Sequence, residues 1–239
     1  ETDARLSPDG RYVSFVRDDE LFVHDTATGE ARQVTRGAGG TIRNAVAEFV
    51  AQEELSRSTG YWWSDDGAFI AFTQIDEAPV AVVERLDFTE AGARTIRQRY
   101  PFAGTDNVRI RLGITTPRGG VPVWADLGDD TDMYLVDVVW HAGRPHVLRL
   151  ARDHQTLDLL AVDVETGAAE RVLRETSDTW LNVVAGMRGE RNGLYPLEDG
   201  GFLWLSERSG WRHVYRYDAT GRLRSEERRV GKECPSPCR

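Results

Sequence analysis

Two adjacent carboxylates stand just ahead of a strongly aromatic segment of this 239-residue chain. Glu53 and Glu54 are followed eight residues later by Trp62 and Trp63, which lead into a Ser-Asp-Asp-Gly turn. An ammonium group has three N–H donors, and two carboxylates can accept two of them in charge-assisted hydrogen bonds. The pair therefore indicates a site for a cationic amine, for example the free N-terminus of a peptide.

The aromatic pair that follows admits two interpretations. Trp62 and Trp63 could form a cage around the amine, or they could begin a strand and pack in the core. The position of Trp63 directly before a tight turn favours the second interpretation.

No catalytic machinery is recognisable in the chain. A Gly-x-Ser-x-Gly nucleophile elbow does not occur. The acidic run from Asp129 to Asp132 lacks the Gly and Glu positions of a calcium-binding EF-hand loop. No histidine has a neighbouring Asp and Ser arrangement that suggests a general base; the five are His24, His141, His146, His154 and His213. We therefore expect no cofactor and no metal, and we place the chemistry outside this chain.

The composition narrows the classes of function. With 40% hydrophobic and 29% charged residues, the chain can form one large all-β domain or two ordinary domains. A net charge of -9 argues against nucleic-acid binding, which needs a basic face. No apolar run approaches the ~18 residues of a membrane helix. The chain starts at Glu1 without a signal peptide, so we expect it to begin inside a longer protein.

The last sixteen residues, 224–239, differ from the rest of the chain. They hold the only lysine, Lys232, and the only cysteines, Cys234 and Cys238, within dense charge and without a strand pattern. We expect a disordered, non-native tail; the alternative is a linker to a further domain. The spacing of the two cysteines is wrong for a zinc clip. Without the tail there is no cysteine, so cytosol and periplasm both stay open.

One pattern of short strands recurs along the chain. A tight turn is followed by a strand, a short loop, a strand ending in Asp, a Gly turn and a further strand, first within residues 7–35. The pattern restarts near residues 64, 133 and 197. β-Branched and aromatic residues fill the strands, and Asp-Gly or Thr-Gly closes them. The period of roughly 45–70 residues is typical of four-stranded propeller blades. We therefore predict an all-β fold, a partial β-propeller of four-stranded antiparallel blades.

The carboxylate pair falls outside this strand pattern. Ala45, Phe49, Gln52 and Leu55 have helix-like spacing, which predicts a short helical insertion near residues 43–56. Neighbouring positions on a helix do not share a face. We therefore expect the pair at a helix end or kink, where both side chains can turn toward one point.

Four segments in the same order resemble the dipeptidyl peptidase IV family, in its bacterial form. They are residues 48–67 around the double Glu, Tyr100–Asn107, Arg152–Leu159 and Ser206–Tyr215. The resemblance covers about residues 4–223. It divides the chain into a β-propeller region, residues 1–223, and the tail, residues 224–239.

The resemblance implies a specific architecture and activity. The family joins an N-terminal propeller to a C-terminal α/β-hydrolase domain that carries the Ser, Asp and His of a serine peptidase. In the family the double Glu binds the α-ammonium of the substrate, so that dipeptides of the Xaa-Pro or Xaa-Ala type are released. Glu53 and Glu54 are the substrate-binding residues that this predicts. An Arg from earlier blades, which helps to hold the substrate carbonyl, has no counterpart here.

The resemblance also implies partners. They are a peptide with a free N-terminus, the hydrolase domain of the intact protein and a second copy in a homodimer of the intact protein. It favours a periplasmic or secreted protein, although the chain alone leaves the compartment unknown. No nucleic acid and no membrane segment are expected.

Two alternatives stay open. The chain could be a non-catalytic propeller scaffold that binds a partner protein, which the missing triad fits directly. It could also belong to a sister exopeptidase with another preference for the residue before the cleaved bond.

Overall fold

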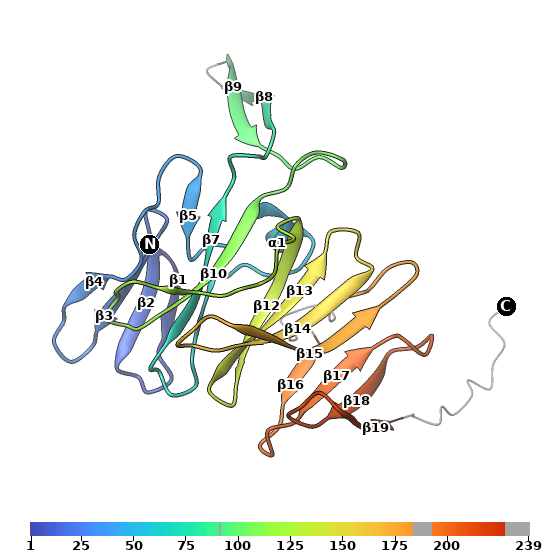
Figure 1. Ribbon diagram of the computed structural model, residues 1–239. Helices are drawn as coiled ribbons and strands as arrows, with labels where there is room; N and C mark the ends of the chain where they lie inside the picture. Colours follow the sequence, from blue (N-terminus) through green and yellow to red (C-terminus); the bar gives the residue numbers. More distant parts are fainter. Residues whose placement is uncertain (91, 184–192, 228–239) are drawn as a thin grey trace.

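The computed structural model describes residues 1–90, 92–183 and 193–227, and their regular secondary structure is almost entirely β. The strands form four antiparallel sheets and one two-stranded hairpin (Figure 1). Short runs of β-branched and aromatic residues form the strands, and glycines with positive φ close many turns between them. The expected all-β, propeller-type fold is confirmed. Within the described residues, no helix is long and apolar enough to cross a membrane.

Three of the four blades are built from consecutive strands, each paired with the next. The first blade contains β1 (Thr2–Leu6), β2 (Tyr12–Arg17), β3 (Glu20–Asp25) and β4 (Ala31–Gln33). The third contains β12 (Met133–His141), β13 (Arg144–Ala151), β14 (Thr156–Val162) and β15 (Ala169–Thr176). The fourth contains β16 (Leu194–Pro196), β17 (Phe202–Ser206), β18 (His213–Tyr217) and β19 (Leu223–Glu227). Each of these three blades is thus built from four strands that follow one another in the chain.

The second blade departs from this plan along one edge. Its strands are β5 (Ile42–Asn44), β6 (Tyr61–Trp63), β7 (Ile70–Asp76), β10 (Arg109–Thr115) and β11 (Val123–Trp124). β7 pairs with β10 along one edge. Along its other edge, β7 pairs with two short strands: its first three residues pair with β6, and its last three residues pair with β5. Residues 45–60 leave the sheet between them. This insertion carries the single described helix, α1 (Phe49–Glu53).

The helical insertion is confirmed, with narrower bounds than residues 43–56. β5 extends to Asn44, and Ala45 has a φ of 58°, so no helix can run through it. Thr73 of β7 fixes both ends of the insertion: its carbonyl accepts from the Ala45 amide at 2.7 Å, and its amide donates to the Gly60 carbonyl at 2.8 Å. The sheet therefore holds the ends, and the helix forms only in the middle.

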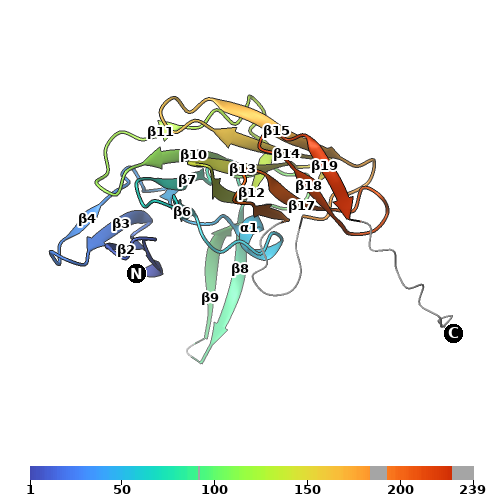
Figure 2. The ribbon, with the colours of Figure 1, turned by 90° about the horizontal axis from the view of Figure 1, so that it is seen from below.

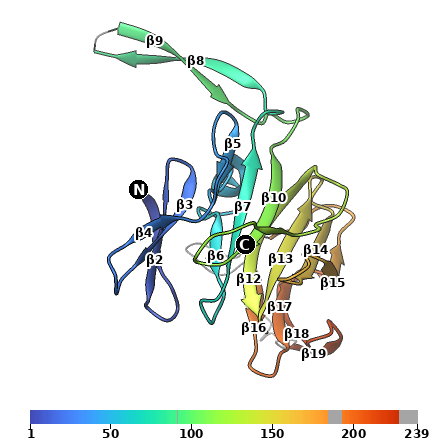
Figure 3. The same ribbon diagram turned by 60° about the vertical axis from the view of Figure 1, so that its left-hand side comes forward.

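A long hairpin of β8 (Val82–Thr89) and β9 (Gly92–Arg99) stands off the second blade (Figure 3). We did not predict it. Most of its side chains are exposed, including Phe88 at 77%. Because neither face is buried, the hairpin lacks the half-buried pattern by which strands are identified in a sequence.

Large apolar side chains fill the space between neighbouring blades. There is one core cluster for each pair of neighbouring blades. Leu21 and Ile70 belong to the cluster between the first and second blades, Leu112 and Leu135 to that between the second and third, and Leu148 and Trp204 to that between the third and fourth. Full burial of one such side chain contributes about 1.5–3 kcal/mol. The blades therefore stabilise one another, and the insertion packs against these clusters through Ala45 and Leu55.

The fourth blade runs past residue 223, where we expected the propeller to end. β19 pairs with β18, with Glu226 opposite Tyr215, so residues 224–227 belong to an edge strand. A charged run can form such a strand because edge strands tolerate charge. The rest of the expected tail, with Lys232, Cys234 and Cys238, lies outside the described residues.

His146 of β13 gives the fold a dependence on pH. It is buried beside His141, with 5.4 Å between the ring centroids, and burial lowers the pKa of His146 from 6.5 to about 4. The folded protein then binds fewer protons than the unfolded chain between these values, so the stabilisation is complete above pH 6.5 and is lost as the pH falls toward 4.

We expect the free energy of unfolding to fall by about 2 kcal/mol more between pH 7.5 and pH 5 in the unsubstituted protein than in a His146→Gln variant. Urea unfolding at the two pH values measures this difference. An equal loss in both proteins would show that His146 does not titrate with the fold.

Candidate functional site

The acidic pair lies at the C-terminal end of α1, as the sequence predicted. Glu53 is the last helical residue, and Glu54 is the C-cap with φ -107° and ψ -27°. Both side chains are exposed, and neither carboxylate forms a hydrogen bond or ion pair with another described residue. The two carboxylates are therefore available to accept hydrogen bonds from a ligand.

Buried residues of the insertion fix the position of the pair. Ala51 and Leu55 are buried on the inner side of the insertion. The Gln52 side chain donates to the Ala47 carbonyl at 2.8 Å. α1 has five residues, far fewer than an isolated helix needs to be stable in water. Its conformation is therefore set by these contacts with the blades.

A buried ion pair closes the insertion around the acidic residues. The Arg57 guanidinium lies 2.6 Å from a Glu48 carboxylate oxygen, and both side chains are no more than 2% exposed. Arg57 also donates to the carbonyls of Thr59, at 2.7 Å, and of Leu135 in β12, at 3.1 Å. The insertion is thus tied to the third blade as well as to the second.

An aromatic cluster lies within electrostatic reach of Glu54, whose charge acts on His154. The His154 ring stacks on Trp180 with 3.7 Å between centroids, and Tyr134 lies 5.6 Å from His154. Burial lowers the pKa of His154, while the negative charges of Asp153 and Glu54 act in the opposite direction. This contact could not be predicted from the sequence, because His154 and Trp180 are brought together by the pairing of β14 with β15.

Other family-like segments meet near α1. Phe49 of α1 contacts Tyr100, with 5.0 Å between ring centroids, and Tyr100 contacts Phe102 at 4.8 Å. The Arg152 guanidinium donates to the Thr105 carbonyl and lies 3.1 Å from a carboxylate oxygen of Asp132. Three of the four segments that carried the resemblance, those around residues 48–67, 100–107 and 152–159, therefore converge.

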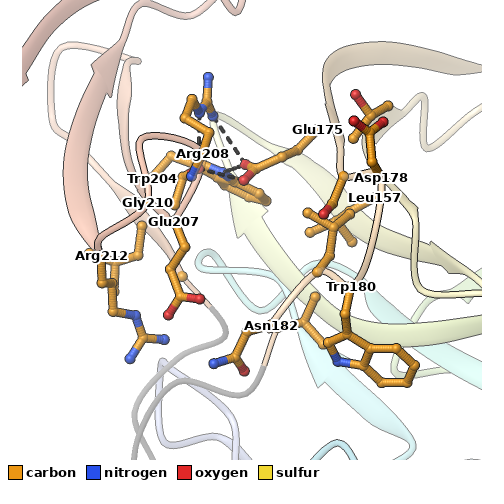
Figure 4. A pocket seen from close by; sticks show the side chains of 17 residues that line it. Leu157, Glu175, Asp178, Trp180, Asn182, Trp204, Glu207, Arg208, Gly210 and Arg212 are labelled. Atoms are coloured by element: carbon orange, nitrogen blue, oxygen red, sulfur yellow. Dashed lines mark hydrogen bonds and ion pairs between the residues drawn. The ribbon is translucent and has the colours of Figure 1, made fainter.

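The fourth segment, residues 206–215, lines a separate cavity of about 540 Å³ (Figure 4). On one side the buried Glu175 accepts hydrogen bonds from Trp204, at 2.5 Å, and from Arg208, at 3.0 Å. Trp180 and Asn182 form another side. Since Trp180 also stacks on His154, it joins this cavity to the aromatic cluster beside Glu54.

The tryptophan pair belongs to the packing between blades. Trp62 donates to the Asp137 carboxylate at 3.1 Å, and Trp63 donates to the Ser14 hydroxyl at 2.8 Å and stacks on Tyr12. Neither ring contact forms a cage at the acidic pair. In the described ranges no group of three or more His, Cys, Asp or Glu side chains could hold a metal ion.

Two exposed carboxylates at the end of α1 can accept hydrogen bonds from a cation. Figure 2 shows α1 on the side of the blades away from β11 and β15.

The family model for the dipeptidyl peptidase IV N-terminal region matches residues 1–233. The chain belongs to this family.

Relatives of this dipeptidyl peptidase IV N-terminal region are longer than the chain. It is 27% identical over 236 residues to the probable dipeptidyl peptidase 4 of Aspergillus fumigatus, covering 91% of the chain and 30% of that protein. It is 28% identical over 183 residues to the inactive dipeptidyl peptidase 10 of Rattus norvegicus, covering 72% of the chain and 23% of that protein. The chain thus spans under a third of the length of these relatives.

A solved structure supports the fold. The crystal structure of Porphyromonas gingivalis dipeptidyl peptidase 4 matches with a TM-score of 0.83 at 24% identity, over 94% of this chain and 32% of that one. The partial propeller seen here is therefore the fold of the corresponding region in that enzyme.

Proposed function

We propose that the chain is the substrate-anchoring and gating propeller of a serine dipeptidyl peptidase that releases Xaa-Pro or Xaa-Ala dipeptides. The observation that carries the proposal is the exposed pair Glu53 and Glu54, unpaired among the described residues and held at the end of a firmly anchored helix. The peptidase chemistry belongs to an α/β-hydrolase domain elsewhere in the same protein.

In this proposal the propeller measures the substrate from its N-terminus. The α-ammonium donates to Glu53 and Glu54, so the scissile carbonyl lies at a fixed distance from the anchor. The serine of the hydrolase domain attacks that carbonyl and the scissile C–N bond breaks, so that the rest of the peptide leaves as an amine. The dipeptide stays on the serine as an acyl-enzyme until water hydrolyses the ester. Enclosure between the two domains excludes water and strengthens the ionic hydrogen bonds at the anchor.

The requirement for a charged amine tests this function. We expect the full-length protein to cleave Ala-Pro-p-nitroanilide. It should act on lactoyl-Pro-p-nitroanilide, in which a hydroxyl replaces the amine, with kcat/KM lower by about 10²-fold or more. N-acetyl-Ala-Pro-p-nitroanilide should not be cleaved. Similar rates for the amine and hydroxyl substrates would contradict the anchoring role.

The similarity to the inactive dipeptidyl peptidase 10 of Rattus norvegicus favours a second candidate, a non-catalytic propeller scaffold that binds a partner protein. The gene sequence beyond codon 223 distinguishes the two. A Gly-x-Ser-x-Gly elbow in frame, with later Asp and His, supports the peptidase. A hydrolase domain that lacks the elbow serine supports the scaffold.

A further inference from the structure

Glu48 and Arg57 enclose the acidic pair in a short closed loop. Their ion pair of 2.6 Å joins the two ends of the segment that contains Glu53 and Glu54. Glu48 is the N-cap residue of α1, and its side chain does not cap the helix amides. The carboxylate therefore serves the ion pair and not the helix end.

The segment inside this loop does not hold its own shape. α1 is a single short turn of helix, and Ser56 has a φ of 53°, a left-handed conformation that costs about 1 kcal/mol or more for a residue with a side chain. A strained residue persists only where its surroundings determine the backbone. Arg57, the next residue, supplies this constraint: its amide donates to the Ala51 carbonyl at 2.9 Å.

Arg57 transmits the position of the neighbouring blade to the loop. Its guanidinium binds Leu135 of β12, Thr59 and Glu48, and Arg57 is 4% exposed as a residue. A buried guanidinium without a carboxylate partner is strongly unfavourable. Glu48 therefore determines whether Arg57 can stay in this buried position.

The pair also sets the local charge. Between Glu48 and Arg57 the segment contains three carboxylates and one guanidinium. Because Glu48 neutralises Arg57, the full negative charge of Glu53 and Glu54 is available to a cation. Without the Glu48 charge, Arg57 would compete with a substrate ammonium for the acidic pair.

We infer that Glu48 is a positioning residue for amine recognition: through its buried ion pair with Arg57 it orients Glu53 and Glu54 and keeps their charge free for the substrate, which it does not touch. This inference rests on the proposed function. A conservative change at Glu48 should then weaken the preference for a charged amine without disabling the peptidase chemistry.

The test compares amine selectivity, the ratio of kcat/KM for Ala-Pro-p-nitroanilide and lactoyl-Pro-p-nitroanilide, in the full-length protein. We expect Glu48→Gln to lower this ratio by about tenfold, mainly through KM for the amine substrate. Asp158→Asn is the matched control, because Asp158 is a buried carboxylate ion-paired with Arg174 on the third blade. It should leave the ratio unchanged even if it lowers stability.

Two further measurements separate positioning from loss of structure. In a Glu53→Gln, Glu54→Gln background, adding Glu48→Gln should change the ratio by less than about twofold, because its effect acts through the acidic pair. If Glu48→Gln does not fold, Arg57→Lys keeps the charge but loses the planar fork that binds Leu135 and Thr59, and it should lower the ratio by about threefold or more.

The outcomes distinguish the two hypotheses. The positioning role of Glu48 is wrong if Glu48→Gln, or Arg57→Lys used in its place, leaves the ratio unchanged by lowering kcat/KM equally for both substrates or for neither. That result would not contradict the binding of the substrate amine by Glu53 and Glu54. If Glu53→Gln and Glu54→Gln themselves leave the ratio unchanged, the proposed function fails.

Discussion

A Glu53→Gln, Glu54→Gln double variant of the full-length protein should lose about 10³-fold in kcat/KM toward Ala-Pro-p-nitroanilide. Each substitution converts a charge-assisted hydrogen bond into a neutral one, and the two together remove the charge that offsets desolvation of the ammonium. Neither carboxylate has a structural partner among the described residues, so the fold should be retained. Steady-state kinetics and a thermal melt of the same preparations measure both quantities.

The specificity of this loss distinguishes anchoring from general damage. Cleavage of the lactoyl substrate should change little, since its hydroxyl makes no ionic contact. Glu84→Gln is the matched control, because Glu84 is an exposed carboxylate on β8 that pairs with Arg97, the residue opposite it on β9. A double variant that cleaves the amine substrate at the unsubstituted rate would remove the basis of the proposal.

The single variants carry further information. Glu53 is the last helical residue and Glu54 is the C-cap, so the two carboxylates extend from different backbone positions. Each single variant should therefore lose about 10-fold to 10²-fold, and the product of the two losses need not equal the loss in the double variant, because both bind one ammonium. The kinetic comparison of the three variants measures this coupling.

Much of the blade architecture could be predicted because its signals are local. The turns Ser7–Gly10 and Ser64–Gly67 are recognisable in the sequence and predict that a strand follows. In both turns the amide of the Gly donates to the carbonyl of the Ser at 2.9 Å. The position of Glu53 and Glu54 at a helix end followed from their adjacency, since neighbours on a helix point apart. These predictions needed no knowledge of distant contacts.

The missed features depend on contacts between distant segments or on exposure. The Glu48–Arg57 pair is buried through the packing of α1 against β12, and an isolated Glu or Arg in a sequence is expected at the surface. The stacking of His154 on Trp180 depends on two loops meeting. The β8–β9 hairpin was missed for the opposite reason, because it has no buried face.

The close approach of one blade to the next gives the largest expected effect on stability. Gly167, in the turn between β14 and β15, has a φ of 77°, and a Cβ there would lie 2.1 Å from the Trp124 carbonyl oxygen of β11. The Gly167 carbonyl also accepts from the Asp126 amide at 2.8 Å. A methyl group at this position must therefore push two backbones apart, and backbone cannot rotate away as a side chain can.

Gly29 supplies a matched control from the first blade. It closes the equivalent turn, and its φ is also 77°. The Gly29 amide donates to the Asp25 carbonyl at 2.9 Å, and the Gly167 amide donates to the Asp163 carbonyl at the same distance. A Cβ at Gly29 would meet no atom within 4 Å. The conformational cost is thus the same at both positions, and only the contact between blades differs.

We expect Gly29→Ala to lower the free energy of unfolding by about 1 kcal/mol and Gly167→Ala by about 3–5 kcal/mol, the excess being the cost of overpacking against backbone. Urea unfolding measures the two losses. Hydrogen exchange adds a local measurement, since the Asp126 amide should lose protection only in Gly167→Ala. Equal losses would mean that the blades can separate without cost, and the support that the third blade gives to the acidic pair through Leu135 would then not be rigid.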